Sequence, residues 1–211
     1  MQLESYPAQV ERWPRAGRHI LAQFDADTIV VYQAFRPSIA RFAAEHGHFE
    51  GGGFSLSRMS WIKPNFLWMM FRCGWATKVD QERVLAVRLR REAFDGLLLG
   101  AVASTPGQVA GRFADDEAWK AAVARSDVRL QWDPDHHPSG DPLDRRALQL
   151  GLRGAALRRY AREAIVAVED VTELVVAQRA HVEQRDWSAL ATPREEVYPV
   201  MPEQAAVLGM G

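Results

Sequence analysis

The sequence is poor in cysteine and has no long hydrophobic run. Cys73 is the single cysteine among 211 residues, so no disulfide can form within the chain and no cage of cysteine ligands can hold a metal. The most apolar stretch, residues 66–71, is far shorter than the roughly 20 residues that cross a bilayer. The first residues lack a basic segment followed by an apolar one, so we expect no targeting peptide. These absences predict a cytoplasmic protein without membrane contact.

The chain also lacks a dominant charge and the common nucleotide motifs. Its net charge of −1 gives the whole molecule no long-range attraction for nucleic acid, so any such contact must be local. No GxGxxG motif follows a strand pattern and no GxxxxGK[ST] motif occurs, which disfavours the usual nucleotide folds. With 47% hydrophobic and 25% charged residues, the composition is that of an ordinary globular protein.

Hydrophobic periodicity predicts short strands and short helices in mixed order. The predicted strands are residues 28–35, 83–89, 128–132 and 147–152. The predicted helices are 38–46, 65–74, 91–100, 117–125, 155–164 and 172–184. Residues 165–171 fit a strand or a helix equally, and 101–117 are predicted as loop. Without a sustained strand-helix-strand rhythm, the pattern predicts an α+β protein with a mixed or antiparallel sheet.

The predicted organisation is one α+β domain with two irregular ends. Residues 1–18 carry prolines and scattered charge without a period, which indicates an N-terminal arm. Residues 19–187 form the predicted single domain, and 188–211 form an extended C-terminal tail with three prolines.

Aromatic and basic residues gather between residues 58 and 75. Trp61 and its neighbouring aromatic side chains offer flat faces, while Arg58, Lys63 and Arg72 supply positive charge beside them. Such a mixture can stack a nucleobase and hold a phosphate. For Trp68 and the apolar residues around it, burial in the core is the simpler interpretation. The charged residues need another explanation, because charged groups are rarely buried without a partner.

This segment is part of a wider resemblance. The stretch RMSWIKPNFLWMMFRCGW (residues 58–75), together with YQA (32–34), QERVL (81–85), QWDP (131–134) and EDVT (169–172), resembles the domain-of-unknown-function family 4291. The resemblance covers roughly residues 20–180 and by itself implies no reaction.

A second resemblance concerns the order of three short motifs. In many ADP-ribosyltransferases a strand carries Tyr-Arg-Gly, a later segment reads Phe-x-Ser-Thr-Ser, and a glutamate precedes a strand. The matching segments here are VYQA (31–34), FSLS (54–57) and QE (81–82). The resemblance implies an ADP-ribosyltransferase-like fold with NAD as cofactor. Tyr32 and Gln33 would then position the dinucleotide, Ser57 would brace it, and Glu82 would stabilise the charge that develops as nicotinamide leaves.

Two departures and two alternatives accompany this hypothesis. Gln33 stands where the family carries a charged residue, so it brings hydrogen bonds but no charge to a pyrophosphate. The segment FSLS (54–57) matches the serine motif only approximately. Glu169 and Asp170 compete with Glu82 for the acidic role. The histidines at 46, 48, 136 and 137 match no standard zinc spacing, so we expect no metal.

The sequence therefore leads to two hypotheses. The first is an NAD-using transferase of the ADP-ribosyltransferase type with Glu82 and Gln33 as catalytic residues. Its cofactor-binding residues would be Tyr32, Ser57, Arg58, Ser60, Trp61 and Lys63. The second is a module that binds a nucleotide or single-stranded RNA without reaction, with tryptophans on the bases and basic residues on the phosphates.

Overall fold

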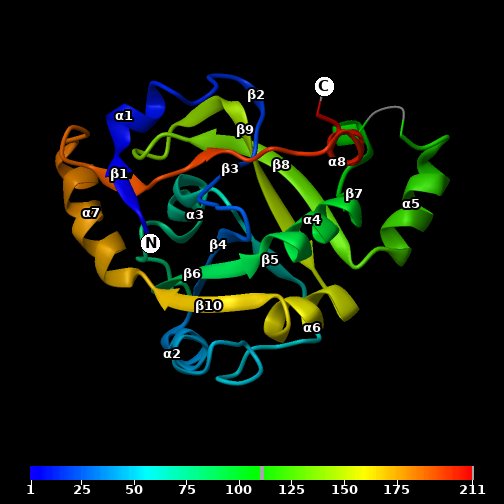
Figure 1. The fold of residues 1–211 in the computed structure, drawn as a ribbon, viewed down its shortest axis with the longest axis horizontal. Coiled ribbons are helices and arrows are strands. Elements are labelled where there is room, and N and C mark those ends of the chain that lie inside the picture. Colours follow the sequence, from blue (N-terminus) through cyan, green and yellow to red (C-terminus); the bar gives the residue numbers. More distant parts are fainter. Residues whose placement is uncertain (110–111, 211) are drawn as a thin grey trace.

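Two β-sheets that meet at strands β4 and β5 form the centre of the molecule (Figure 1). The computed structural model describes residues 1–109 and 112–210. The first sheet is antiparallel, in the order β10-β6-β4. Its strands are β4 (Thr28–Phe35), β6 (Arg83–Arg90) and β10 (Ile165–Asp170). Strands β4 and β6 pair over their full length, from Thr28 opposite Arg90 to Phe35 opposite Arg83, which makes β6 the central strand.

The second sheet is mixed, in the order β2-β9-β8-β7. Strand β5 also pairs with β9, along a different part of that strand from β2. Its strands are β2 (Gly17–Arg18), β5 (Ser60–Ile62), β7 (Ala101–Ala103), β8 (Val128–His136) and β9 (Pro142–Leu152). A single antiparallel bridge connects the two sheets. The amide of Tyr32 donates to the carbonyl of Lys63 at 2.7 Å, and the amide of Lys63 donates back at 3.3 Å. This bridge places Lys63 where the sheets join.

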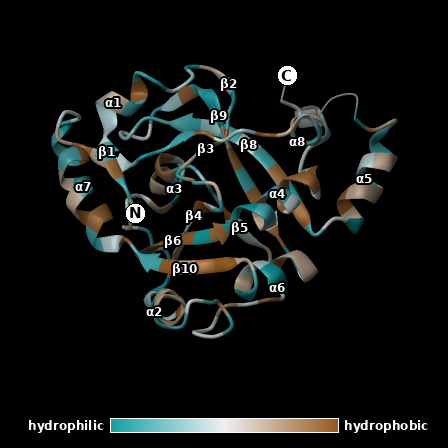
Figure 2. Ribbon diagram, viewed as in Figure 1, coloured by the Kyte–Doolittle hydropathy of each residue, from teal (hydrophilic) through white to brown (hydrophobic). Residues whose placement is uncertain are grey.

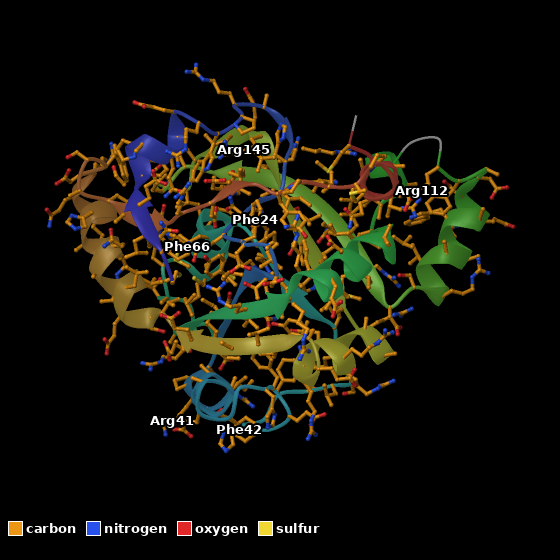
Figure 3. All side chains as sticks on the ribbon, in the orientation of Figure 1. Phe24, Arg41, Phe42, Phe66, Arg112 and Arg145 are labelled. Carbon is orange, nitrogen blue, oxygen red and sulfur yellow. The ribbon has the colours of Figure 1, made fainter. Side chains whose placement is uncertain are left out.

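Helices cover the outer faces of both sheets. They are α1 (Tyr6–Val10), α2 (Pro37–His46), α3 (Phe66–Cys73), α4 (Arg91–Leu99), α5 (Asp116–Arg125), α6 (Gly154–Arg162), α7 (Thr172–Gln184) and α8 (Pro202–Leu208), with a 3-10 turn at Pro106–Val109. Helix α2 lies at the lower edge of the view, where Arg41 and Phe42 are far from the buried Phe66 (Figure 3). In the described part of the chain, no helix combines the length and apolar character needed to span a membrane.

The apolar side chains form two cores, one on each face of β4. Hydrophobic residues are frequent along the central strands (Figure 2). Because successive strand residues point to opposite faces, Ile29 and Val31 enter the first core while Val30 and Tyr32 enter the second. The first core is shared with the inner face of the second sheet. The second lies beneath α3 and α7. Together the cores make one α+β domain.

The predicted strands and helices are present, and their boundaries shift by a few residues. The equivocal stretch 165–171 is strand β10, because it pairs with β6 from Ile165 to Asp170. Helix α3 begins as predicted after Asn65, whose side-chain oxygen accepts a hydrogen bond from the amide of Trp68 at 2.6 Å. The predicted loop after residue 100 contains strand β7, which pairs with β8.

The two ends of the chain depart most from the prediction of an irregular arm and an extended tail. Strand β1 (Leu3–Ser5) pairs with β11 (Ala191–Pro193), and β12 (Glu196–Val197) pairs with β3 (Leu21–Ala22). Helix α8 then packs against α4. The four strands are two or three residues long, and each pairs with a strand near the opposite end of the chain. Local periodicity therefore does not reveal them.

Candidate functional site

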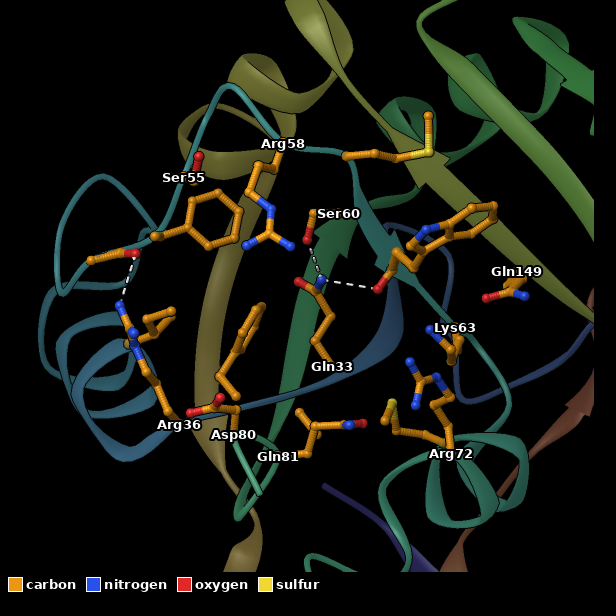
Figure 4. A pocket seen from close by; sticks show the side chains of 18 of the residues that line it. Gln33, Arg36, Ser55, Arg58, Ser60, Lys63, Arg72, Asp80, Gln81 and Gln149 are labelled. Atoms are coloured by element: carbon orange, nitrogen blue, oxygen red, sulfur yellow. Dashed lines mark hydrogen bonds between the residues drawn. The ribbon is translucent and has the colours of Figure 1, made fainter. Parts of the chain in front are cut away.

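A cavity of about 640 Å³ lies where β4 and β5 meet, between the loop after α2 and the end of α3 (Figure 4). We call this cavity the junction pocket. Its wall carries four cationic side chains, four glutamines and three aromatic rings, but one carboxylate, that of Asp80. The cations are Arg36, Arg58, Lys63 and Arg72; the glutamines are Gln33, Gln81, Gln131 and Gln149; the rings belong to Phe35, Phe54 and Trp61. The lining is therefore cationic in a protein of almost neutral net charge.

Lys63 is the most unusual member of this wall. The residue is only 4% exposed, and its ammonium has no hydrogen-bond acceptor and no ion-pair partner among the residues that the structure describes. The ammonium is not among the fully enclosed polar atoms, and the residue lines the pocket, so its charged end faces the cavity. Its Nζ lies 4.9 Å from the centre of the Trp68 ring. Burial, followed by the positive charge of Arg72, lowers the pKa of Lys63 from 10.5 to about 7, against a smaller opposing effect of Asp133. A lysine with a largely buried side chain, a lowered pKa and a charged end that faces a cavity is a candidate ligand-binding group.

The three arginines reach the pocket from different segments of the chain. Arg72 lies in the last turn of α3, close to Lys63 (Figure 4). Arg36 is the N-cap residue of α2 and donates to the carbonyl of Gly53 at 3.3 Å, which ties it to the three consecutive glycines at 51–53. Among residues 1–109 and 112–210, neither Arg58 nor Arg72 has an ion pair or a side-chain hydrogen bond. Both guanidinium groups are thus available to an anion.

The polar side-chain atoms of Gln33, in contrast, are hydrogen-bonded within the protein. Its Nε2 donates to the hydroxyl of Ser60 at 2.8 Å and to the carbonyl of Trp61 at 2.9 Å. Its Oε1 accepts from the hydroxyl of Tyr160 at 2.6 Å. The side chain is 3% exposed and connects β4 to β5 and to α6. Its geometry is that of a scaffold residue in the pocket wall.

Trp61 depends on a glycine of the neighbouring strand. Residues Trp61 and Gly151 are paired between β5 and β9. A Cβ atom on Gly151 would lie 2.7 Å from Sδ of Met59 and 3.0 Å from the Trp61 ring. The indole therefore lies close against the backbone of β9 at Gly151, in space that a side chain at this position would fill, and it also lines the pocket.

The floor of the pocket is a polar row on β8 and β9. Nε2 of Gln149 donates to Oε1 of Gln131 at 2.9 Å and to Oδ2 of Asp133 at 2.6 Å. Burial raises the pKa of Asp133, although the hydrogen bond from Gln149 and the charge of Lys63 act in the opposite direction. This row leaves the carbonyl of Gln149 and the amide nitrogen of Gln131 as possible contacts for a polar ligand.

The structure brings together five of the eight residues predicted for the site. Gln33, Arg58, Ser60, Trp61 and Lys63 all line the junction pocket. Their proposed roles stay predictions, and for Gln33 the internal hydrogen bonds indicate a structural one.

The other three predicted residues lie outside the wall. Tyr32 is fully buried in the second core, where its ring packs edge-on against Phe66, and burial raises the pKa of its hydroxyl far above the ordinary value. The hydroxyl of Ser57 contacts that of Ser55 at 3.0 Å on the exposed loop. Oε1 of Glu82 accepts from the amide of Asp80 at 3.0 Å, and its Oε2 is buried without a hydrogen-bond partner among the described residues.

The two residues that compete with Glu82 for the acidic role lie on β10, at the edge of the first sheet. Asp170 forms an ion pair with Arg83 at 2.8 Å and accepts from the amide of Thr172, which begins α7. Glu169 lies near the terminal amine, at 3.6 Å. Neither carboxylate lines the junction pocket. Across the described ranges, no group of three or more His, Cys, Asp or Glu side chains is arranged to hold a metal ion.

Sequence reasoning missed the glutamines of the floor. Gln131 lies between Leu130 and Trp132, and Gln149 between Leu148 and Leu150, with all four apolar neighbours buried in the first core. Alternation of this kind places the glutamines on the opposite face of the sheet. A polar position repeated on two adjacent buried strands was the signal that could have identified them.

The fold and the site define an α+β domain with a cationic pocket at the junction of two sheets. The chain belongs to a family described as "Domain of unknown function (DUF4291)", whose profile matches residues 19–198. No curated protein matches the sequence.

Proposed function

We propose that the junction pocket binds a nucleotide, alone or within a short single-stranded RNA. The observation that carries the proposal is Lys63, whose side chain is 4% exposed and whose ammonium faces the pocket without an acceptor among the described residues. An anion that enters the pocket would supply the missing partner. Arg58 and Arg72 add two guanidinium groups without ion pairs among the described side chains. Guanidinium groups bind phosphate with charge-assisted hydrogen bonds.

The aromatic part of the lining supports a nucleotide over a simple anion. Trp61, Phe54 and Phe35 lie in the same wall as the cations. Stacking on such rings contributes about 1–3 kcal/mol per base and tolerates different bases. The volume of about 640 Å³ falls in the range of ligand pockets. The single cysteine, which is buried and unpaired, favours a reducing compartment such as the cytoplasm. In that compartment nucleotides would be available as ligands.

Transfer from NAD remains the second hypothesis that the sequence supplies. NAD belongs to the same ligand class, since it carries two phosphates and two aromatic bases. The catalytic carboxylate would be Glu82, whose neighbours Asp80 and Gln81 line the pocket while Glu82 does not. The site geometry therefore supports binding more directly than transfer.

The test is a comparison of ligands and of two arginine variants. Thermal unfolding and calorimetric titration with ATP, GTP, NAD and a short RNA measure binding, because a ligand of the folded state raises the melting temperature. We expect Arg58→Gln to weaken binding roughly tenfold, because a hydrogen bond to a charged group contributes about 1.5 kcal/mol or more. Arg41→Gln, on the outer edge of α2, is the matched control and should bind as the wild type does.

Three results separate the hypotheses. If no ligand raises the melting temperature, or if both variants bind equally, the pocket is not a nucleotide site. Binding without turnover supports the binding module. Release of nicotinamide from NAD that is lost in Glu82→Gln would instead establish the transferase.

A further inference from the structure

The inner end of the junction pocket differs from its outer end. At the inner end Lys63 and Arg72 lie near each other, beside Gln149 (Figure 4). At the outer end Arg36 is tied to Gly53. The adjoining residues Phe35 and Phe54 line the same end, where their rings meet edge to face with centres 5.8 Å apart. The pocket is thus asymmetric, with its most deeply buried charge at one end and two aromatic rings at the other.

We propose that Lys63 and Arg72 form a subsite for the terminal phosphate of a nucleoside monophosphate, and that Lys63 takes up a proton when this phosphate binds. The proposal rests on the proposed function and assigns a direction to the ligand. The phosphate lies at the inner end, and the base extends toward Phe54 and Phe35.

The charges around Lys63 favour a dianion. The groups that face its ammonium are Arg72 and the thiol of Cys73 from α3 and the carboxyl of Asp133 from β8. Arg72 adds a second positive charge, and Asp133 is engaged by Gln149. Two adjacent cations without an ion pair among the described residues match the two negative charges of a terminal phosphate above its second pKa of about 6. A phosphodiester within a strand carries a single charge and matches less well.

Proton uptake follows from the burial of the amine. The pKa of Lys63 is lowered to about 7 in the empty pocket, so at pH 8 most molecules carry a neutral amine. A dianion within hydrogen-bond distance favours the ammonium and raises this pKa. Binding at pH 8 must then draw a proton from solvent. By linkage, affinity falls up to about tenfold for each unit of pH above 7.

The experiment is calorimetric titration of the full chain with the four ribonucleoside 5′-monophosphates and with the corresponding nucleosides. Titrations at pH 8 in buffers of different ionisation enthalpy measure the protons taken up. We expect the monophosphates to bind at least tenfold more tightly than the nucleosides, with uptake approaching one proton. Removal of one charge-assisted phosphate contact in Lys63→Met or Arg72→Gln should weaken monophosphate binding by roughly ten- to one-hundredfold. Nucleoside binding should stay unchanged in both variants.

The two variants also separate proton uptake from charge. Lys63→Met should lose uptake. Arg72→Gln should retain part of it, because burial, the larger cause of the lowered pKa of Lys63, is unchanged while the contribution of Arg72 is lost. Lys120→Met, on the exposed surface of α5, is the lysine control. Monophosphate binding with no proton uptake, or with equal affinity in Lys63→Met, overturns the subsite and leaves the proposed function standing. If neither nucleosides nor monophosphates bind, the proposed function fails as well.

Discussion

Two groups of buried polar side chains adjoin helix α3, and they differ in how their hydrogen bonds are used. The first, which we call the terminal polar cluster, consists of Gln9, Asn65, Asp135, Arg145 and Glu195. Each of its members has partners within the protein. The second is the junction pocket, where Lys63 is equally buried but has no acceptor among the described residues. Burial alone therefore does not distinguish a polar group with partners inside the protein from one that has none among the described residues.

The difference lies in what each group connects. In the terminal polar cluster, Glu195 accepts from the amide of Phe66 at 2.7 Å, and its own amide donates to Gln9 at 2.8 Å. These bonds attach both ends of the chain to α3. Removal of such a partner leaves a buried group unsatisfied and costs stability. Removal of Lys63 leaves nothing unsatisfied, so the two regions should respond with opposite sign.

The largest expected effect is that of Arg145→Met in the terminal polar cluster. Arg145 donates from Nε to Asp135 at 2.7 Å and from another nitrogen to the carbonyl of Pro14 at 2.6 Å, and both ion-pair partners are buried. Its loss leaves an uncompensated carboxylate, which costs about 3–5 kcal/mol. Urea denaturation measures the loss. Arg146→Met, the exposed neighbour, should change stability by less than about 0.5 kcal/mol. Similar losses in both variants would contradict the structural role of the ion pair.

A smaller loss is expected for Gln33→Ala, in the scaffold of the junction pocket. The substitution removes three hydrogen bonds and leaves the buried hydroxyl of Tyr160 without its partner. We expect a loss of about 2–3 kcal/mol in the free energy of unfolding. Gln81→Ala is the matched control, because Gln81 lines the same pocket and its only hydrogen bond in the described part of the chain is that of its backbone amide. A loss in Gln33→Ala no larger than in the control would return Gln33 to the list of ligand contacts.

Lys63→Met should have the opposite sign and a magnitude of about 1 kcal/mol, since it replaces a buried amine without acceptor by an apolar side chain. The folded state holds the pKa of Lys63 near 7, below its ordinary 10.5, so the unfolded chain binds more protons between these values. Wild-type stability therefore rises with pH above 7, and the advantage of the variant should shrink there. Urea denaturation at pH 6.5, 8 and 9.5 measures this, with Lys120→Met as the control. A variant less stable than the wild type at every pH would show that Lys63 is structural.

The sequence was sufficient where a signal is local. Alternation within β4, β6 and β8 predicted those strands, and Asn65 marked the start of α3 through its capping side chain. The same holds for Lys63 in the pocket. A lysine in a run of buried aromatic residues stood out because its charge has no local partner.

The sequence was insufficient where partners are distant. Gln33 was predicted to bind a cofactor, but its partner Tyr160 lies 127 residues further along the chain, and no local pattern announces that bond. Strands β1 and β11 are three residues each and acquire their identity only by pairing with one another. Glu82 was chosen from motif order, which says nothing of the direction in which its side chain points. Sequence order therefore located the pocket but did not separate its scaffold from its contacts.

At low pH, Glu195→Gln is expected to change the free energy of unfolding least of all these variants. The same variant gives the sharpest test of the terminal polar cluster when the pH is raised. Burial raises the pKa of Glu195 well above its ordinary 4.5, outweighing the hydrogen bond from Phe66. The folded state thus binds more protons than the unfolded chain above pH 4.5, so Glu195 makes the wild type less stable as pH rises. Glutamine resembles the protonated acid and removes this dependence.

At pH 5 the variant and the wild type should agree within about 0.5 kcal/mol, whereas Glu195→Ala should lose about 2 kcal/mol with its hydrogen bonds. At pH 8 Glu195→Gln should be the more stable protein in urea denaturation. If it is instead less stable at pH 8 than at pH 5 relative to the wild type, Glu195 is ionised in the folded protein, and the cluster contains a buried charge that Arg145 must compensate.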